Sequence, residues 1–372
     1  LLQSDLGGEN VPQVWGQRIG TGETDDHPVL NSTSAYTVYK TAPESHCQGY
    51  SNTKDASREH KYQNGVCTYC GECEQATPAE GNYYEISNQG QLRWFADQVN
   101  NQNRPDINAR LMNDITMDGT EWTPIGTDTI QFTGTFDGQN HTITGLYIDG
   151  TEDYVGLFGC IGKNRLATGT VKNVTLADSY VRGNQYVGSI CGMNNGGTLQ
   201  NCHNAGTVSG TTNVGGVCGY NKGNTLQKCY NTGNVTGKND CTGGVCGYNE
   251  GTLQECYNNG DVSGTTNVGG VCGYNIPGYS IGEGTLQKCY NTGKVTGTSN
   301  RVGGVCGQNE SGTVSGCYNT GKVTGNYPVG SVCGWNGGAT VEKCYYLAGT
   351  SEKAVGDGTG NRNETCESKT EL

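Results

Sequence analysis

Cysteine is the residue type of this chain that offers the most chemistry, because 19 of the 372 residues are Cys. A thiol can form a disulfide, bind a metal ion, act as a nucleophile or pack as a small apolar group. So many cysteines favour a secreted protein with disulfides, and leave buried thiols and metal ligands as alternatives. An odd number leaves at least one thiol unpaired or bonded to another chain. Cys241 and Cys366 are our candidates for such an intermolecular bond.

A first group of cysteines lies near a histidine in the N-terminal region. Cys67 and Cys70 are separated by two residues, a spacing typical of metal ligands. Together with Cys47 and His60, they would complete a tetrahedral structural zinc site. The alternative, which a secreted chain favours, is two disulfides among Cys47, Cys67, Cys70 and Cys73. A redox role is disfavoured, because no βαβ pattern surrounds this group.

A second group of cysteines recurs in two series. The first series is Cys191, Cys218, Cys246, Cys272, Cys306 and Cys333, and the second is Cys202, Cys229, Cys256, Cys289, Cys317 and Cys344. Successive members of each series lie 26 to 28 residues apart, except where residues 276–282 lengthen one repeat. A fixed period of this kind indicates a repeat architecture.

The repeat itself predicts strands. Each copy holds three short phrases rich in Val, Thr, Tyr and Leu, separated by Asn and Gly at the turns. No copy has the length of helical periodicity that a helical repeat needs. We therefore predict an all-β fold, a β-solenoid with about 27 residues and three strands per coil. Equivalent residues then stack about 4.8 Å apart.

Stacking predicts rows of identical side chains. A tyrosine row would contain Tyr230, Tyr257, Tyr290, Tyr318 and Tyr345, and an asparagine row Asn231, Asn258, Asn291 and Asn319. Each coil also carries one cysteine of each series. Either a disulfide crosses each coil, such as Cys218 to Cys229, or the cysteines form two rows of buried thiols.

The repeats resemble the GLUG motif, a short repeat of bacterial surface proteins. The resemblance rests on Gly-Gly-Val-Cys-Gly-Tyr-Asn at residues 215–221 and Leu-Gln-Lys-Cys-Tyr-Asn-Thr-Gly at 226–233, and it extends over about 155–347. The motif occurs in adhesin-like proteins and beside the catalytic region of some IgA-specific metallopeptidases. The resemblance implies a right-handed parallel β-helix outside the cell, at the bacterial cell surface.

The peptidase activity is not implied, because it needs a helix with two histidines flanking a glutamate. No two of the five histidines have that spacing. The acidic residues are scattered, whereas a polysaccharide-active β-helix enzyme needs carboxylates paired within a groove. We therefore expect no catalytic residue and no enzymatic activity, with a polysaccharide-active enzyme as a less favoured alternative.

Five segments are expected along the chain. They are an extended segment (1–40), a Cys/His-rich mini-module (41–80), a capping helix with the first coils (81–154), the repeats (155–347) and a C-terminal tail (348–372). Within the third, apolar residues at Leu92, Phe95, Ala96 and Val99 predict an amphipathic helix. Ser87 is its expected N-cap, and the helix is expected to cover the open end of the solenoid.

Residues 1–40 resemble the piece that normally closes a GLUG-type solenoid, yet they precede the repeats. We expect this arm to add to the solenoid of another copy, through Val14, Trp15, Ile19, Val29 and Leu30. Such head-to-tail contact does not close on itself and gives filaments. A chain that begins with Leu is alternatively expected to be a processed product or a module cut from a larger adhesin.

The composition of the chain excludes some classes of binding partner. The net charge of −12, without a basic cluster, argues against nucleic-acid binding, and the absence of a long apolar run argues against membrane insertion. We expect an extracellular filament subunit or adhesin stalk. The alternative is an adhesin module that binds a glycan or a host surface protein, with the tyrosine row and Tyr220, Tyr248, Tyr274 and Trp335 as an aromatic stripe.

Overall fold

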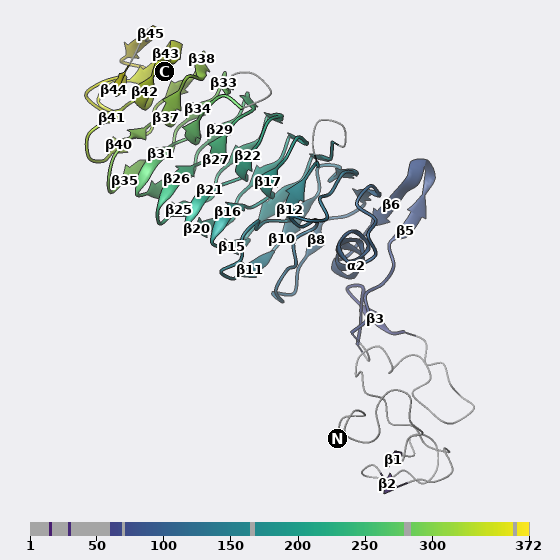
Figure 1. Cartoon of the computed structure of the whole chain (residues 1–372). Coiled ribbons are helices and arrows are strands. Elements are labelled where there is room, and N and C mark those ends of the chain that lie inside the picture. Colours follow the sequence, from purple (N-terminus) through teal and green to yellow (C-terminus); the bar gives the residue numbers. More distant parts are fainter. Residues whose placement is uncertain are drawn as a thin grey trace. The chain divides into compact units, whose positions relative to one another are not determined.

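The computed structural model describes residues 15–16, 29–30, 60–68, 71–163, 168–278, 284–359 and 363–371. Contacts divide the chain into two compact units, residues 1–75 with 88–94 and residues 76–87 with 95–372. The second unit, here called the solenoid, is built from stacked parallel strands, apart from the antiparallel pair β5 and β6 near its start (Figure 1). The predicted parallel β-helix is therefore confirmed, while its handedness and the five segment boundaries stay predictions.

Three sheets of the solenoid are named here by the residues that repeat along them, counting only described strands. The Val–Thr sheet contains seven strands: β11 (Tyr147–Asp149), β15 (Tyr180–Arg182), β20 (Thr207–Gly210), β25 (Val235–Gly237), β30 (Val262–Gly264), β35 (Val295–Gly297) and β40 (Val323–Thr324). The Val–Gly sheet contains six: β16 (Gln185–Gly188), β21 (Thr212–Gly215), β26 (Asp240–Gly243), β31 (Thr266–Gly269), β36 (Val302–Gly303) and β41 (Val329–Gly330). The Cys sheet contains eight: β12 (Phe158–Ile161), β17 (Cys191–Asn194), β22 (Cys218–Asn221), β27 (Cys246–Asn249), β32 (Cys272–Asn275), β37 (Cys306–Glu310), β42 (Cys333–Gly337) and β44 (Val355–Thr359).

The fourth and largest sheet, the Leu–Tyr sheet, has 20 described strands in two series. One series is β5 (Thr77–Ala79), β6 (Tyr83–Ile86), β7 (Asn108–Leu111), β9 (Thr135–Asp137), β13 (Thr170–Lys172), β18 (Thr198–Gln200), β23 (Thr225–Gln227), β28 (Thr252–Gln254), β33 (Thr285–Gln287), β38 (Thr313–Ser315), β43 (Thr340–Leu347) and β45 (Asn363–Lys369). The other is β8 (Ile115–Thr116), β10 (Thr142–Thr144), β14 (Thr175–Ala177), β19 (His203–Asn204), β24 (Tyr230–Asn231), β29 (Tyr257–Asn258), β34 (Tyr290–Asn291) and β39 (Tyr318–Asn319).

The number of strands per repeat differs from the prediction. In the described repeat 207–231 the chain forms five short strands, β20 to β24, rather than three. Gly216 and Val217 separate β21 from β22, so one apolar phrase supplies strands to two sheets. Cys229, in the middle of another phrase, lies between β23 and β24. The corners between sheets cannot be located from the sequence pattern, because corner residues such as Val217 and Cys229 are as apolar and buried as the residues of the strands.

Register places equivalent residues of successive repeats beside one another. Cys218 pairs with Cys246 in the Cys sheet, and Leu226 pairs with Leu253 in the Leu–Tyr sheet. The inward-facing Val, Leu and Cys side chains are almost completely buried. The core is therefore a set of columns in which each residue packs on its counterpart above and below.

Helix α2 (Gln89–Asn100) forms where the apolar spacing predicted it. Its N-cap is Asn88 rather than Ser87, because the Asn88 side-chain oxygen accepts a hydrogen bond from the Gln91 amide at 2.9 Å. Phe95 lies 6.0 Å from Phe132 and 6.1 Å from Phe136 between ring centroids. These large rings fill the first coils, where the later coils have Val and Cys. The capping role of the helix stays a prediction.

The remaining described elements are short. They are a 3-10 turn η2 (Glu80–Asn82) and the antiparallel pairs β1 (Trp15–Gly16) with β2 (Val29–Leu30) and β3 (Tyr62–Gln63) with β4 (Val66–Cys67). In the part of the chain that the structure describes, every helix is too short or too polar to cross a membrane.

Candidate functional surfaces

The two predicted cysteine series form two rows of thiols inside the solenoid. All cysteines of both series are buried and none is in a disulfide. The structure therefore contains the second of the two predicted alternatives, two rows of buried thiols, and not a disulfide across each coil. Each thiol bonds along the axis or to a nearby carbonyl; the Cys256 thiol, for example, donates to the carbonyl of Leu226 at 3.3 Å. Burial and the neighbouring Cys218 thiol hold the pKa of Cys246 well above its usual range.

The candidates for an intermolecular disulfide occupy different environments. Cys241 is only 3% exposed and lies in β26, so its thiol cannot reach another molecule without local unfolding. We therefore discard Cys241. Cys366 is half-buried in β45, opposite Cys344, and extends the second thiol row by one coil. Cys366 stays a candidate.

Asparagine side chains form two buried ladders, of which only one was predicted. In the predicted ladder, each Asn donates to the side-chain oxygen of the next, with distances of 2.7 Å from Asn231 to Asn258 and 2.8 Å from Asn258 to Asn291. Its other amide hydrogen goes to a turn carbonyl, such as that of Gly260. The second ladder comprises Asn194, Asn221, Asn249, Asn275, Asn309 and Asn336. The repeated Gly-Tyr-Asn phrase was the signal for it.

The tyrosine row stacks ring upon ring. Tyr257 and Tyr290 lie 4.6 Å apart between centroids with 2° between their planes, and Tyr230 and Tyr318 continue the stack. Each interior ring therefore has both faces covered by its neighbours. A sugar binds an aromatic residue through the ring face, so the interior of this row cannot act as the predicted glycan platform. Only the ring edges and phenol hydroxyls of these interior tyrosines face solvent.

A second aromatic row follows the corner between the Val–Gly and Cys sheets. Tyr154 stacks on Tyr186 at 5.0 Å, and Tyr186 stacks on Tyr220 at 5.5 Å. Tyr220, Tyr248 and Tyr274 then meet edge to face. Farther along, Arg301 lies over the Trp335 ring at 5.1 Å. Most of these ring faces are therefore also occupied within the molecule.

One buried threonine interrupts a valine column. Thr242 is fully buried between Val214 and Val268, and its hydroxyl has no hydrogen-bond partner among the described residues. Thr242→Val should therefore raise the free energy of unfolding by about 1–2 kcal/mol, because it removes an unsatisfied polar group. Denaturant unfolding measures the change. Thr266→Val, at a half-buried position, serves as the control; equal effects of both variants would contradict the explanation.

His203 occupies the position before Tyr230 in the tyrosine row. The two rings lie 4.0 Å apart, and burial lowers the pKa of His203. The unfolded chain therefore binds the proton more readily, and stability should fall as the pH drops through about 6.5. His203→Tyr should flatten this part of the curve. The measurement is thermal unfolding from pH 5 to 8, and an unchanged slope in the variant would count against the assignment.

The predicted zinc site falls only partly within the described residues. Cys47 and Cys70 lie outside them. His60 stacks on Tyr62 at 5.4 Å and lies 3.4 Å from a carboxylate oxygen of Glu72, while Cys67 is buried in β4. Among the described residues, no group of three or more His, Cys, Asp or Glu is placed to hold a metal ion. The zinc site and the disulfides at Cys47, Cys67, Cys70 and Cys73 stay predictions.

The predicted assembly arm is described at four positions. Trp15 pairs with Leu30 and Gly16 with Val29 in an antiparallel register, so these backbones bond to each other within their own unit. Val14 and Ile19 lie outside the described residues. Addition of the arm to another copy stays a prediction.

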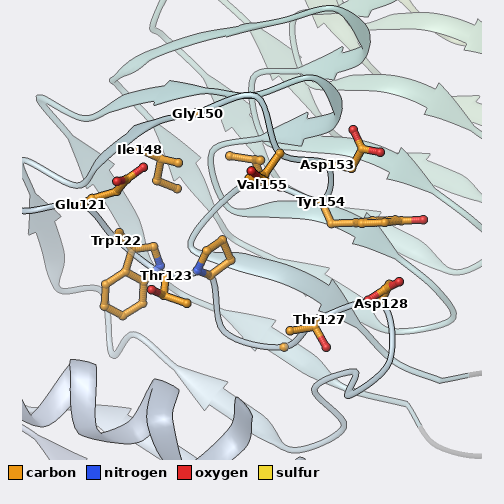
Figure 2. Close-up of a pocket in the computed structure, with 13 residues that line it drawn as sticks. Glu121, Trp122, Thr123, Thr127, Asp128, Ile148, Gly150, Asp153, Tyr154 and Val155 are labelled. Atoms are coloured by element: carbon orange, nitrogen blue, oxygen red, sulfur yellow. The ribbon is translucent and has the colours of Figure 1, made fainter. Parts of the chain in front are cut away.

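Near the N-terminal end of the solenoid lies a pocket that sequence analysis did not find. Its volume is about 380 Å³, and it is lined by residues 121–128 of one coil and 148–155 of the next. Figure 2 shows Tyr154 on one side, between Asp128 and Asp153, and Trp122 with Glu121 on the other. Residues 121–128 do not follow the repeat, so no periodic signal could reveal the pocket.

Residues 298–324 match the family described as the GLUG motif. This chain carries the GLUG motif. The matched GLUG residues include β36, the Cys306 strand β37 and β38, all within the stacked part of the solenoid.

Two relatives are similar to part of this chain. Halomucin of Haloquadratum walsbyi is 40% identical over 80 residues, which cover 21% of this chain and 1% of halomucin. A candidate Gly-rich membrane protein of Evansella cellulosilytica is 34% identical over 115 residues, covering 28% of this chain and 13% of that protein. The chain thus spans only a small part of the length of either relative.

The fold also matches a solved structure, a candidate immunoglobulin A1 protease from Bacteroides ovatus. The TM-score is 0.52, and the match covers 80% of this chain and 87% of the other at 20% sequence identity. At this identity the likeness concerns the fold alone.

Proposed function

We propose that this chain is a non-enzymatic structural module at the bacterial cell surface, serving as an adhesin stalk or as the subunit of a head-to-tail filament. The observation that carries the proposal is the continuity of the buried amide and thiol rows from coil to coil. Each coil bonds to the next through backbone, Asn and Cys together. A stack held in this way resists bending and suits a spacer.

The named relatives agree with such a role. One relative is by its name a Gly-rich membrane protein, and this chain itself carries the GLUG motif. The acidic net charge of −12 keeps such a module soluble and separates it from nucleic acids.

Electron microscopy of the purified chain, with and without reductant, tests the proposal. Uniform fibres would identify a filament subunit, and loss of fibres on reduction would implicate Cys366. Single rods would identify a stalk. Compact particles without an axis would overturn the structural role, as would polysaccharide cleavage by the purified protein.

The head-to-tail arm has its own test. Trp15→Asp with Leu30→Asp should abolish fibres while leaving the solenoid rods visible, because the two charges oppose burial of the arm against another copy. Glu352→Gln, a surface change elsewhere, is the control. Fibres that persist in the double variant would exclude the arm as the assembling segment.

A glycan-binding or host-protein-binding adhesin module is the second candidate. The aromatic rows support it less well than their sequence suggested, since their interior ring faces are covered. Glycan binding would have to use ring edges, hydroxyls or the ends of the rows.

A further inference from the structure

The pocket at residues 121–155 lies at the end of the second aromatic row that begins with Tyr154. Tyr186 of the following coil covers one face of Tyr154 at 5.0 Å. The pocket lining comes from the coil of Tyr154 and from the coil before it, with none from the coil of Tyr186. The pocket therefore borders the other face of Tyr154, in the place where one more stacked ring would continue the row.

The pocket combines an apolar base with a negative rim. Trp122, Ile148 and Val155 are 2%, 5% and 2% exposed and form the base. The Trp122 indole N–H is already used, because it donates to the carbonyl of Leu157 at 3.1 Å. The base thus offers apolar contact and no free donor from this ring.

Every charged side chain that lines the pocket is a carboxylate: Glu121, Asp128, Glu152 and Asp153. The Asp153 carboxylate accepts bonds from the Asn184 side chain at 2.9 Å and the Gln185 amide at 3.1 Å, both neutral donors. Within the described residues, no ion pair neutralises Asp128, Glu152 or Asp153. The two aspartates flank Tyr154 in Figure 2 and also contribute to raising the pKa of its phenol, after burial as the main cause.

We propose that this pocket binds a small organic cation with an apolar body, an alkylammonium or quaternary ammonium group. The apolar part would lie on Trp122, Ile148 and Val155, and the positive charge would face the open side of Tyr154 between Asp128 and Asp153. A cation in this place is attracted both by the aromatic face of Tyr154 and by the nearby carboxylates, and the partial exclusion of water strengthens both attractions. A neutral sugar would gain nothing from uncompensated negative charge. The proposal is independent of the structural role.

Calorimetric titration of the full chain with choline and its neutral isostere 3,3-dimethyl-1-butanol tests the site. Choline should bind with millimolar affinity and the isostere should not. A lysine amide blocked at its α-amino group, used as a third probe, shows whether a peptide side chain is also accepted as the source of the cation. Asp128→Asn with Asp153→Asn should weaken choline binding about tenfold, since each exposed carboxylate contributes about threefold.

Two controls keep the result interpretable. Glu352→Gln removes the same charge at a different cavity and should leave choline binding unchanged. Tyr154→Leu should reduce the preference for choline over the isostere while retaining an apolar wall, because the cation–π contact is lost and the carboxylates of Asp128 and Asp153 remain. Equal binding of choline and isostere, an equal loss in Glu352→Gln, no saturable choline binding, or displacement of choline by an equal concentration of Ca²⁺ would each overturn the proposal.

Discussion

Replacing Asn258 by alanine is expected to lower the free energy of unfolding by about 4 kcal/mol. Asn258 is fully buried and makes three hydrogen bonds, to Asn231, Asn291 and the carbonyl of Gly260. The variant leaves an amide hydrogen of Asn231 and the side-chain oxygen of Asn291 without this partner inside the core. Each buried group left unsatisfied costs about 1–3 kcal/mol.

Guanidinium chloride unfolding of the two proteins measures this difference. The matched control is Asn259→Ala in the same coil, because the Asn259 side chain is exposed and accepts a bond from the Thr292 hydroxyl, and alanine keeps the backbone bond to Asn231. The control should change stability by less than about 0.5 kcal/mol. Similar losses in both variants would show that the ladder does not hold the coils together.

Replacing Gly243 by alanine is expected to cost about 3 kcal/mol or more. A Cβ at this position would lie 2.0 Å from the carbonyl oxygen of Cys246 and 2.8 Å from the amide nitrogen of Gly273 in the next coil. Both are backbone atoms, so they can move only if the coils separate locally. Equivalent glycines in the neighbouring repeats, such as Gly215 and Gly269, meet the same obstacle.

Gly316→Lys is the control for this prediction. Gly316 has φ of 62°, yet Lys288 and Lys343 adopt φ of 54° and 53° at the equivalent positions of neighbouring repeats. A Cβ there would meet only the Lys288 side chain at 3.8 Å. The control should therefore stay within about 1 kcal/mol of the parent. Unfolding curves that rank the two variants in the opposite order would contradict the close stacking of the coils.

Periodicity explains what could be predicted from this sequence. Rows such as Tyr230 to Tyr318 follow directly from the repeat, since stacking copies places equal residues together. The corners could not be predicted, because Gly216 and Val217 sit within an apolar phrase. The repeat also does not predict the orientation of the tyrosine rings, because packing at each corner decides whether they stack face to face or meet edge to face.

The candidate functional residues also divide into those that the repeat predicts and those that it does not. The thiol rows were foreseen as one of two alternatives, and choosing between them required the geometry of the coil. The pocket around Tyr154 was missed, because it arises where residues 121–128 depart from the repeat. Sites made by breaks in a repeat are invisible to an analysis based on its period.

The most direct test of the central claim, a core of in-register rows that includes free thiols, is alkylation followed by intact-mass measurement without reductant. Cysteines of the two series should resist a thiol reagent in the native protein, because they are buried and burial opposes thiolate formation. They should all react once denaturant is added. Cysteines that become reactive only after reduction would show disulfides across the coils, and rapid labelling of the native protein would show that the rows are not buried.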